Sequence, residues 1–154
     1  MESKLYKKIM VATDGSENAN KAALSGIEIT RLSGAKLYAV NVIPKVPHLS
    51  YFGVPIEPPK NVSPDEYDLH KHLEEDGMKT LETVKEMGAK VGVQMETVLL
   101  EGHPGSEIID FAEKKDIDLI VMGTLGRTGL DRIIVGSVAQ DVIRHAGARV
   151  MIVK

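Results

Sequence analysis

The chain has 154 residues, about the length of one domain, and its 43% hydrophobic and 27% charged residues exclude overall disorder. The absence of cysteine excludes disulfides, cysteine-ligated metals and thiol catalysis. A net charge of −3 and few aromatic residues argue against a nucleic-acid partner, and no apolar run is long enough to suggest a membrane partner, so we expect a cytoplasmic protein.

Apolar periodicity predicts short strands that alternate with helices. The first strand is predicted over Lys8–Thr13, and Ser16 is the expected N-cap of the helix that follows it. This helix repeats small or apolar residues along one face, which favours close packing against a sheet, and Gly34 is its expected stop. The residues of that face are Ala19, Ala22, Ala23, Gly26 and Ile27. The second strand is predicted over Lys36–Ile43.

A proline-rich loop is predicted at about 44–63. Six of the seven prolines fall within Pro44–Pro64, so this segment cannot form a helix or a paired central strand. Loops of this length are normally functional or disordered. Two readings stay open: the segment folds over a ligand or a dimer seam, or it is disordered.

A long helix is predicted after the proline-rich loop. Ser63 and Glu66 form a capping box with Pro64 at the first helical position. Gly88 or Gly92 is the expected end of the helix. Its predicted buried face consists of Leu69, Leu73, Leu81 and Val84.

Three further strands are predicted, over Gln94–Leu100, Asp118–Met122 and Arg149–Val153. A helix with Ile108, Ile109 and Ala112 on its inner face precedes the second of these strands. Another helix precedes the last one, with Ser137 and Gln140 as its capping box and Gly147 as its end. The residues expected to line its inner face are Val138, Ala139, Val142, Ile143 and Ala146.

This order predicts a single-domain α/β fold over residues 1–154, with a doubly wound five-stranded parallel sheet and helices on both faces. Ligands of such sheets bind beyond the carboxyl ends of the strands. Three segments should meet there: 12–16 after the first strand, the end of the second strand at Val42, and the glycine-rich segment that starts at Gly123.

The glycine-rich segment reads Gly123-x2-Gly126-x9-Gly136-Ser137. Glycines allow backbone N–H groups to approach a phosphate, and a helix start at Ser137 offers free N–H groups to an anion. Arg127 and Arg132 are available as charge partners. Against this phosphate-binding hypothesis stands the plainer interpretation that the glycines only form turns and Ser137 only caps a helix.

These motifs resemble the universal stress protein family. The resemblance rests on Ala12-Thr13-Asp14-Gly15-Ser16, on Gly102-x-Pro104, on the strand leading into Gly123-x2-Gly126, on Gly136-Ser137-Val138 and on the terminal strand. The spacing G-x2-G-x9-G-[ST] is typical of the ATP-binding branch of that family. The resemblance implies a strand order of 3-2-1-4-5 and an ATP site at the carboxyl edge of the sheet.

The resemblance also implies the parts of that site. Ala12, Asp14 and the backbone of Val42 would hold the adenosine end, and Met122 and Gly123 would lie beside the ribose. A divalent ion, Mg or Mn, would be held through the phosphates rather than by a protein metal site. The phosphate-binding residues would be Gly126, Arg127, Gly136, Ser137 and Val138.

The sequence leaves the activity open. Asp14 is the candidate catalytic residue, but the favoured interpretation is that it accepts hydrogen bonds from the nucleotide or from its own loop. The hypotheses are a nucleotide-dependent regulatory switch read by a downstream protein, a slow ATPase or phosphotransferase, and an interaction module with an inert pocket. His103 is expected to be a loop residue.

A homodimer is predicted through the last strand. Arg149–Val153 would form a sheet edge whose residues 150–153 carry no proline or charge, and such an edge tends to recruit another chain.

Overall fold

The computed structural model of the chain describes residues 5–45, 64–124 and 135–154, without the side chains of 64–67. The proline-rich segment 46–63, the capping residue Ser63, and Gly126, Arg127 and Arg132 therefore lie outside the described residues.

One parallel sheet organises the molecule. Its strand order is β3-β2-β1-β4-β5, which confirms the predicted fold class and the order implied by the family resemblance. β1 lies at the centre, paired with β2 from Lys8 to Ala12 and with β4 from Ile9 to Val11. The strands are β1 Lys8–Ala12, β2 Lys36–Ile43, β3 Met95–Glu101, β4 Leu119–Gly123 and β5 Arg149–Val153.

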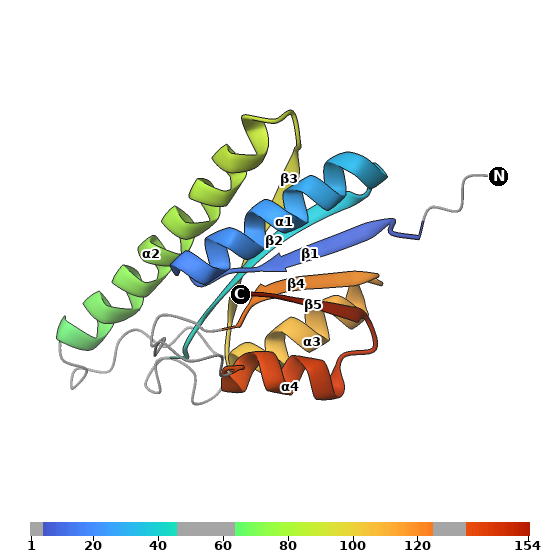
Figure 1. Cartoon of the computed structure of the whole chain (residues 1–154). Helices are drawn as coiled ribbons and strands as arrows, with labels where there is room; N and C mark the ends of the chain where they lie inside the picture. Colours follow the sequence, from blue (N-terminus) through green and yellow to red (C-terminus); the bar gives the residue numbers. More distant parts are fainter. Residues whose placement is uncertain (1–4, 46–63, 125–134) are drawn as a thin grey trace.

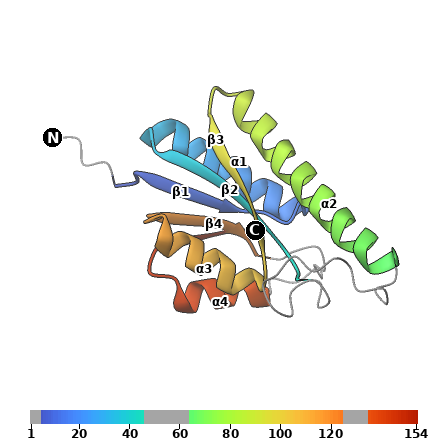
Figure 2. The same ribbon diagram turned by 180° about the vertical axis from the view of Figure 1, so that it is seen from behind.

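The helices cover both faces of the sheet (Figures 1 and 2). They are α1 Glu17–Ser33, α2 Pro64–Ala89, α3 Pro104–Lys114 and α4 Ser137–His145. α1 and α2 bury small and aliphatic residues with one face of the strands, and α3 and α4 do so on the other face. The sheet therefore has a hydrophobic core on each face. Alternate residues of a strand belong to one core or the other, because successive side chains point to opposite faces. Val11 therefore belongs to the first core and Met10 to the second.

Close packing of α1 confirms the predicted small-residue face. Ala19, Ala22, Ala23, Gly26 and Ile27 are all buried. A Cβ atom at Gly26 would lie 2.3 Å from Cγ2 of Val11, so only glycine allows this helix to approach β1 so closely. The helix begins at the Ser16 cap and ends at Gly34, whose φ of +69° is left-handed.

The strand ends differ by one residue from those predicted. β1 ends at Ala12 rather than Thr13, and β4 runs to Gly123 rather than Met122. β4 also begins after Asp118, whose carboxylate accepts hydrogen bonds from the N–H groups of Lys7 and Lys8, at 2.8 and 2.9 Å. β3 is shifted by one residue, to Met95–Glu101.

The prediction that Leu69 is buried was wrong, because its side chain is 52% exposed. Leu81 and Val84 are buried as predicted, and Leu73 is half-buried. With 26 residues α2 is about 39 Å long, longer than the eight-residue strand β2, about 26 Å, beside which it packs. Its first turns therefore extend past the apolar surface that buries Leu81. α2 ends at Ala89, next to Gly88.

Two details of α4 also correct the sequence reading. Ile143 is 48% exposed, although Ala139 and Val142 are buried, so the buried stripe of this nine-residue helix is narrower than predicted. The helix ends at His145 and its C-cap is Ala146, not Gly147. Ala146 has extended backbone angles that lead directly toward β5, so no left-handed glycine is needed there.

Candidate functional site

A pocket of about 300 Å³ lies at the carboxyl edge of the sheet, within the range typical of small-molecule sites. Residues from the ends of β1, β2 and β4 and from the starts of α3 and α4 converge on it. Every predicted site residue that the structure describes lines this pocket. They are Ala12, Asp14, Val42, Met122, Gly123, Gly136, Ser137 and Val138. The predicted Gly126 and Arg127 lie outside the described residues.

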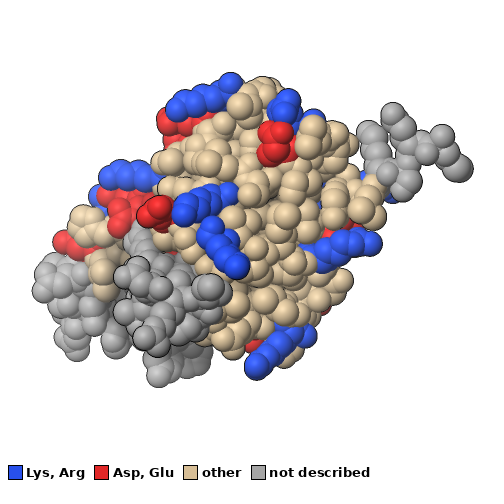
Figure 3. Space-filling view, viewed as in Figure 1, with Lys and Arg blue, Asp and Glu red and all other residues tan. Residues whose placement is uncertain are grey.

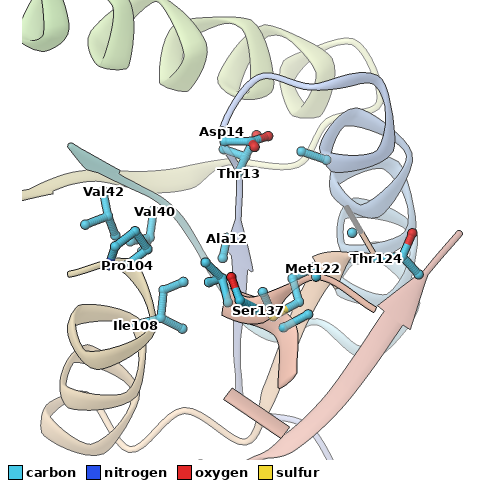
Figure 4. A pocket seen from close by; sticks show the side chains of 15 residues that line it. Ala12, Thr13, Asp14, Val40, Val42, Pro104, Ile108, Met122, Thr124 and Ser137 are labelled. Atoms are coloured by element: carbon cyan, nitrogen blue, oxygen red, sulfur yellow. The ribbon is translucent and has the colours of Figure 1, made fainter. Parts of the chain in front are cut away.

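One side of the pocket is an apolar wall that the sequence analysis largely missed. Val40 and Val42 from β2 stand beside Pro104 and Ile108 from α3 (Figure 4). Period-two alternation could have identified Val40, because it shares a strand face with Val42. The Gly102-x-Pro104 motif carried a signal for Pro104, but nothing in it indicated a pocket position. Thr13, Ala19, Thr124 and Ala139 complete the lining.

The turn after β1 is held by its own side chains. Asp14 Oδ1 accepts a hydrogen bond from the Ser16 N–H at 3.0 Å, and Thr13 Oγ1 accepts one from the Gly15 N–H at 3.2 Å. Gly15 has a φ of +79°, a left-handed conformation that favours glycine. The Asp14 carboxylate thus organises the loop, as the favoured sequence interpretation proposed, while its residue lines the pocket.

Thr124 ties three segments together at the end of β4. Its N–H donates to the Val153 carbonyl, its carbonyl accepts from the Gly136 N–H at 2.7 Å, and its hydroxyl oxygen accepts from Asn18 Nδ2 at 2.7 Å. Gly123 gives α1 room, because a Cβ there would lie 3.0 Å from the Asn18 carbonyl carbon. The predicted close approach at Gly123 is therefore to α1. Whether it also serves a ligand stays a prediction.

The N-terminus of α4 differs from its prediction. Ser137 is the first helical residue and Gly136 is the N-cap, with no side-chain hydrogen bond at the cap. The prediction of a capping box formed by Ser137 and Gln140 was therefore wrong. Gln140 Nε2 instead donates a hydrogen bond to the Val135 carbonyl at 2.7 Å. The Ser137 side chain is exposed at the pocket, and the first turn contains no acidic residue. This end of the helix can accept an anion.

Charge is sparse around the pocket. Asp14 is the one ionisable residue among the described residues that line it. On the face above α1 and α2, basic and acidic side chains are interspersed rather than gathered into a basic patch (Figure 3). Elsewhere on the described surface, exposed ion pairs include Arg31 with Glu28 and Lys36 with Glu96. His103 precedes α3, is exposed and does not line the pocket.

The described residues contain no group of three acidic or histidine side chains that could hold a metal ion. None of the described helices is both long and apolar enough to cross a membrane. The carboxylate of Asp118 lies at the opposite edge of the sheet. There the N–H groups of Lys7 and Lys8, with smaller effects from neighbouring positive charges, lower the pKa of Asp118.

Comparison with known proteins identifies the family and supports the fold. The model of the universal stress protein family matches residues 5–154. The chain is 43% identical to universal stress protein MJ0531 of Methanocaldococcus jannaschii over 150 residues, which cover 97% of this chain and 83% of that protein. The solved structure of protein MJ0577, from the same organism, is 30% identical and superposes with a TM-score of 0.79 over 97% of this chain and 96% of that chain.

A third relative was solved with a ligand. It is the universal stress protein from Archaeoglobus fulgidus in complex with dAMP, which is 28% identical and has a TM-score of 0.66, over 97% of this chain and 99% of that one. The family match covers nearly the whole chain, and the superposition on the solved relative supports the fold. The chain therefore belongs to the universal stress protein family.

Proposed function

We propose that this protein binds ATP in the carboxyl-edge pocket and acts as a regulatory switch whose nucleotide state is read by another protein in a cytoplasmic stress response. The main observation behind the proposal is that one pocket contains both an apolar wall and the N-terminus of α4, which has no side-chain cap. The two parts suit the two ends of a nucleotide. A relative of the same fold in complex with dAMP supports an adenine nucleotide as the ligand.

The adenosine end is assigned to the β1 and β2 side. Val40, Val42 and Ile108 form an apolar surface for the base, and Val42 has backbone groups at the end of its strand. Asp14, at the rim above Ala12, is placed to accept hydrogen bonds from ribose hydroxyls (Figure 4). Met122 and Gly123 would lie beside the ribose.

The phosphates are assigned to the start of α4. The first N–H groups of a helix lack intrahelical partners, and the helix dipole adds positive potential at this end. The Ser137 hydroxyl is exposed there and donates to a phosphate oxygen in this proposal. Gly126, Arg127 and Val138 are proposed to complete the cradle. Mg or Mn would bind through the phosphate oxygens, since the described residues of the pocket lining supply one carboxylate, that of Asp14.

A slow ATPase is the competing function. Phosphoryl transfer requires a group that positions water and cations that neutralise charge, and Asp14 is the candidate for the first role. Its engagement with the Ser16 N–H favours an organising role instead. Single-turnover hydrolysis by purified protein separates the two. Turnover that Asp14→Asn abolishes, with ATP binding retained, would establish the enzyme.

The primary test of binding uses protein as purified. Denaturation should release an adenine nucleotide, and Mg·ATP should raise the Tm of nucleotide-free protein, because a ligand that binds only the folded state stabilises it. Protein that contains no nucleotide and shows no thermal shift with Mg·ATP would instead favour an interaction module with an inert pocket.

A homodimer through β5 completes the proposal. β5 and β3 are the two edges of the sheet. The β3 edge carries Glu96 and Glu101, whereas residues 150–153 of β5 are uncharged and Met151 is 41% exposed. Charges discourage pairing of edges between molecules, so β5 is the edge expected to recruit a second copy. Light scattering should report a dimer that Met151→Lys dissociates, whereas Leu32→Lys on α1 should leave it intact.

A further inference from the structure

The hydrogen-bond ladder between β1 and β2 ends one bond earlier than a continued parallel pairing would. The last paired residues are Ala12 and Val40, and the Thr13 N–H still donates to the Val40 carbonyl at 2.9 Å. In a continued parallel ladder the next bond would join the Val42 N–H to the Thr13 carbonyl. That bond is absent from the described residues.

A side chain occupies the Thr13 carbonyl instead. Asn41 Nδ2 donates to it at 2.8 Å, and this hydrogen bond is buried. Both backbone groups of Thr13 are thus held, one by the β2 main chain and one by the Asn41 amide. The position of Thr13 in turn fixes where the Asp14 loop leaves the sheet.

Asn41 is otherwise out of place. Asparagine is disfavoured in strands, and β2 is mostly apolar around it. The residue is 6% exposed, and its Oδ1 atom is buried without a hydrogen-bond partner. Burial of an unsatisfied carbonyl oxygen costs stability that an apolar residue would avoid. An asparagine at this buried position therefore points to a local task.

The neighbouring helix makes room for this amide. A Cβ at Gly77 of α2 would lie 2.8 Å from Asn41 Oδ1 and 2.6 Å from Leu99 Cδ1. Glycine at position 77 therefore lets α2 pass over Asn41 without displacing it. Asn41 itself does not line the pocket, whereas Thr13, Asp14 and Val42 do.

We propose that Asn41 is a positioning residue for base recognition, a role that rests on the nucleotide-binding function proposed above. By holding the Thr13 carbonyl, it ends the ladder early and leaves the Val42 N–H and C=O for a ligand. In a parallel strand these two groups point to the same side, so together they present one donor and one acceptor. Adenine offers the complementary pair at its Watson–Crick edge, the N1 acceptor and the N6 donor. Hypoxanthine offers the reverse pair, an N1 donor and an O6 acceptor.

The first experiment measures base selectivity. ATP and ITP carry identical phosphates, so the ratio of their Kd values cancels effects on phosphate binding and on overall stability. We expect the wild type to prefer ATP by about tenfold or more, and Asn41→Ala to reduce the preference to about threefold or less. Thr30→Val is the matched control. It removes another buried polar atom without a partner, on α1, and should leave the ratio unchanged.

The second experiment uses nucleotide-free protein and does not depend on ATP binding. Amide hydrogen exchange should be fast at Val42 and slow at Val40 in the wild type, and Asn41→Ala should slow exchange at Val42 as the ladder extends. If Asn41→Ala does not fold, Gly77→Ala, which displaces the Asn41 amide, takes its place with the same expected changes.

The outcomes separate the two proposals. A Val42 amide as protected as that of Val40 in the wild type, or an unchanged ATP preference in a folded Asn41 variant, overturns the role of Asn41. Failure of the wild type to bind either nucleotide overturns the proposed function. In that case the exchange measurement alone decides whether Asn41 ends the ladder.

Discussion

The N-termini of α1 and α4 flank the same edge of the sheet, and they differ in how they are capped. α1 has a serine cap, since Ser16 Oγ accepts from the Ala19 N–H at 3.2 Å, and Glu17 adds an acid to the first turn. α4 has neither feature. Its cap is Gly136 without a side-chain bond, and its first turn holds no acid. The start of α1 satisfies one of its free N–H groups with its own cap and carries an acid, whereas the start of α4 has neither, so only the second favours an anionic ligand.

The largest expected effect, on ATP affinity, comes from giving α4 a side-chain N-cap like that of α1. Gly136 has φ −62° and ψ 162°, angles that any residue adopts, so Gly136→Asp can place a carboxylate over the first turn. We expect ATP affinity to fall about a hundredfold, because the carboxylate takes the N–H groups and repels phosphate. The Tm of nucleotide-free protein should rise slightly, because aspartate is a better cap. Calorimetric titration and thermal unfolding measure the two effects.

Gly136→Asn is the control for that substitution. Asparagine caps without charge, so its loss of ATP affinity should be smaller than that of Gly136→Asp. Adenosine, which lacks phosphates, should bind both variants like the wild type. Equal losses for adenosine and ATP would mean that the start of α4 does not face the phosphates.

A pair of serine substitutions sharpens the comparison. Ser16→Ala should cost about 1 kcal/mol of unfolding free energy with little effect on ATP, because it removes a working cap. Ser137→Ala should leave unfolding nearly unchanged and weaken ATP about tenfold, because that hydroxyl caps nothing in this fold. Urea unfolding and titration of both variants give the two numbers, and the reverse pattern would contradict the assignment.

Removing the hydrogen bond between Asn18 and Thr124, which links the starts of the two helices, should have a moderate effect on stability. Thr124→Val keeps the shape of a buried side chain but removes the acceptor of the Asn18 amide. We expect a loss of about 1 kcal/mol in unfolding free energy. A Tm equal to that of the wild type would show that Asn18 and Thr124 do not couple α1 to β4.

The smallest effect concerns Asp118, where a carboxylate at the far edge satisfies two backbone N–H groups. Those N–H groups, from Lys7 and Lys8, hold its folded pKa below the ordinary value of about 3.9. The stabilisation by Asp118 is therefore fully present above the ordinary, unfolded pKa, and it is lost as the pH falls from there through the lower folded pKa. Asp118→Asn should flatten this part of the acid unfolding profile. A variant profile that still falls as steeply would assign the acid sensitivity to other carboxylates.

The sequence predicts most of this fold because local rules and global pattern agree. The small residues Ala22, Ala23 and Gly26 recur at helical spacing, and the apolar run of β4 marks a strand buried on both faces. The prediction failed where geometry beyond the local pattern decides. Leu69 has the spacing of a buried residue, but the length of α2 carries it past the core.

The site was predictable in its backbone and less so in its walls. Glycine spacing and topology indicated Gly123 and Gly136, because the end of a buried strand and the start of a helix can be recognised from nearby residues. Pro104 and Ile108 belong to a helix on the far side of the pocket, and only the assembled sheet brings them beside Val42. Asn41 gave a faint signal as a polar residue in an apolar strand, which tertiary contacts alone could interpret.

The central position of β1 has a consequence for folding kinetics. β1 and β2 form contacts close in sequence, but Ile9 pairs with Leu119, so this pairing must close a loop of more than a hundred residues. Contacts of such separation form slowly. The pocket spans this seam, with Ala12 and Val42 on one side and Met122 and Ser137 on the other. We therefore expect a bound nucleotide to slow unfolding by bridging the two sides of this seam, which stopped-flow unfolding with and without ATP would measure.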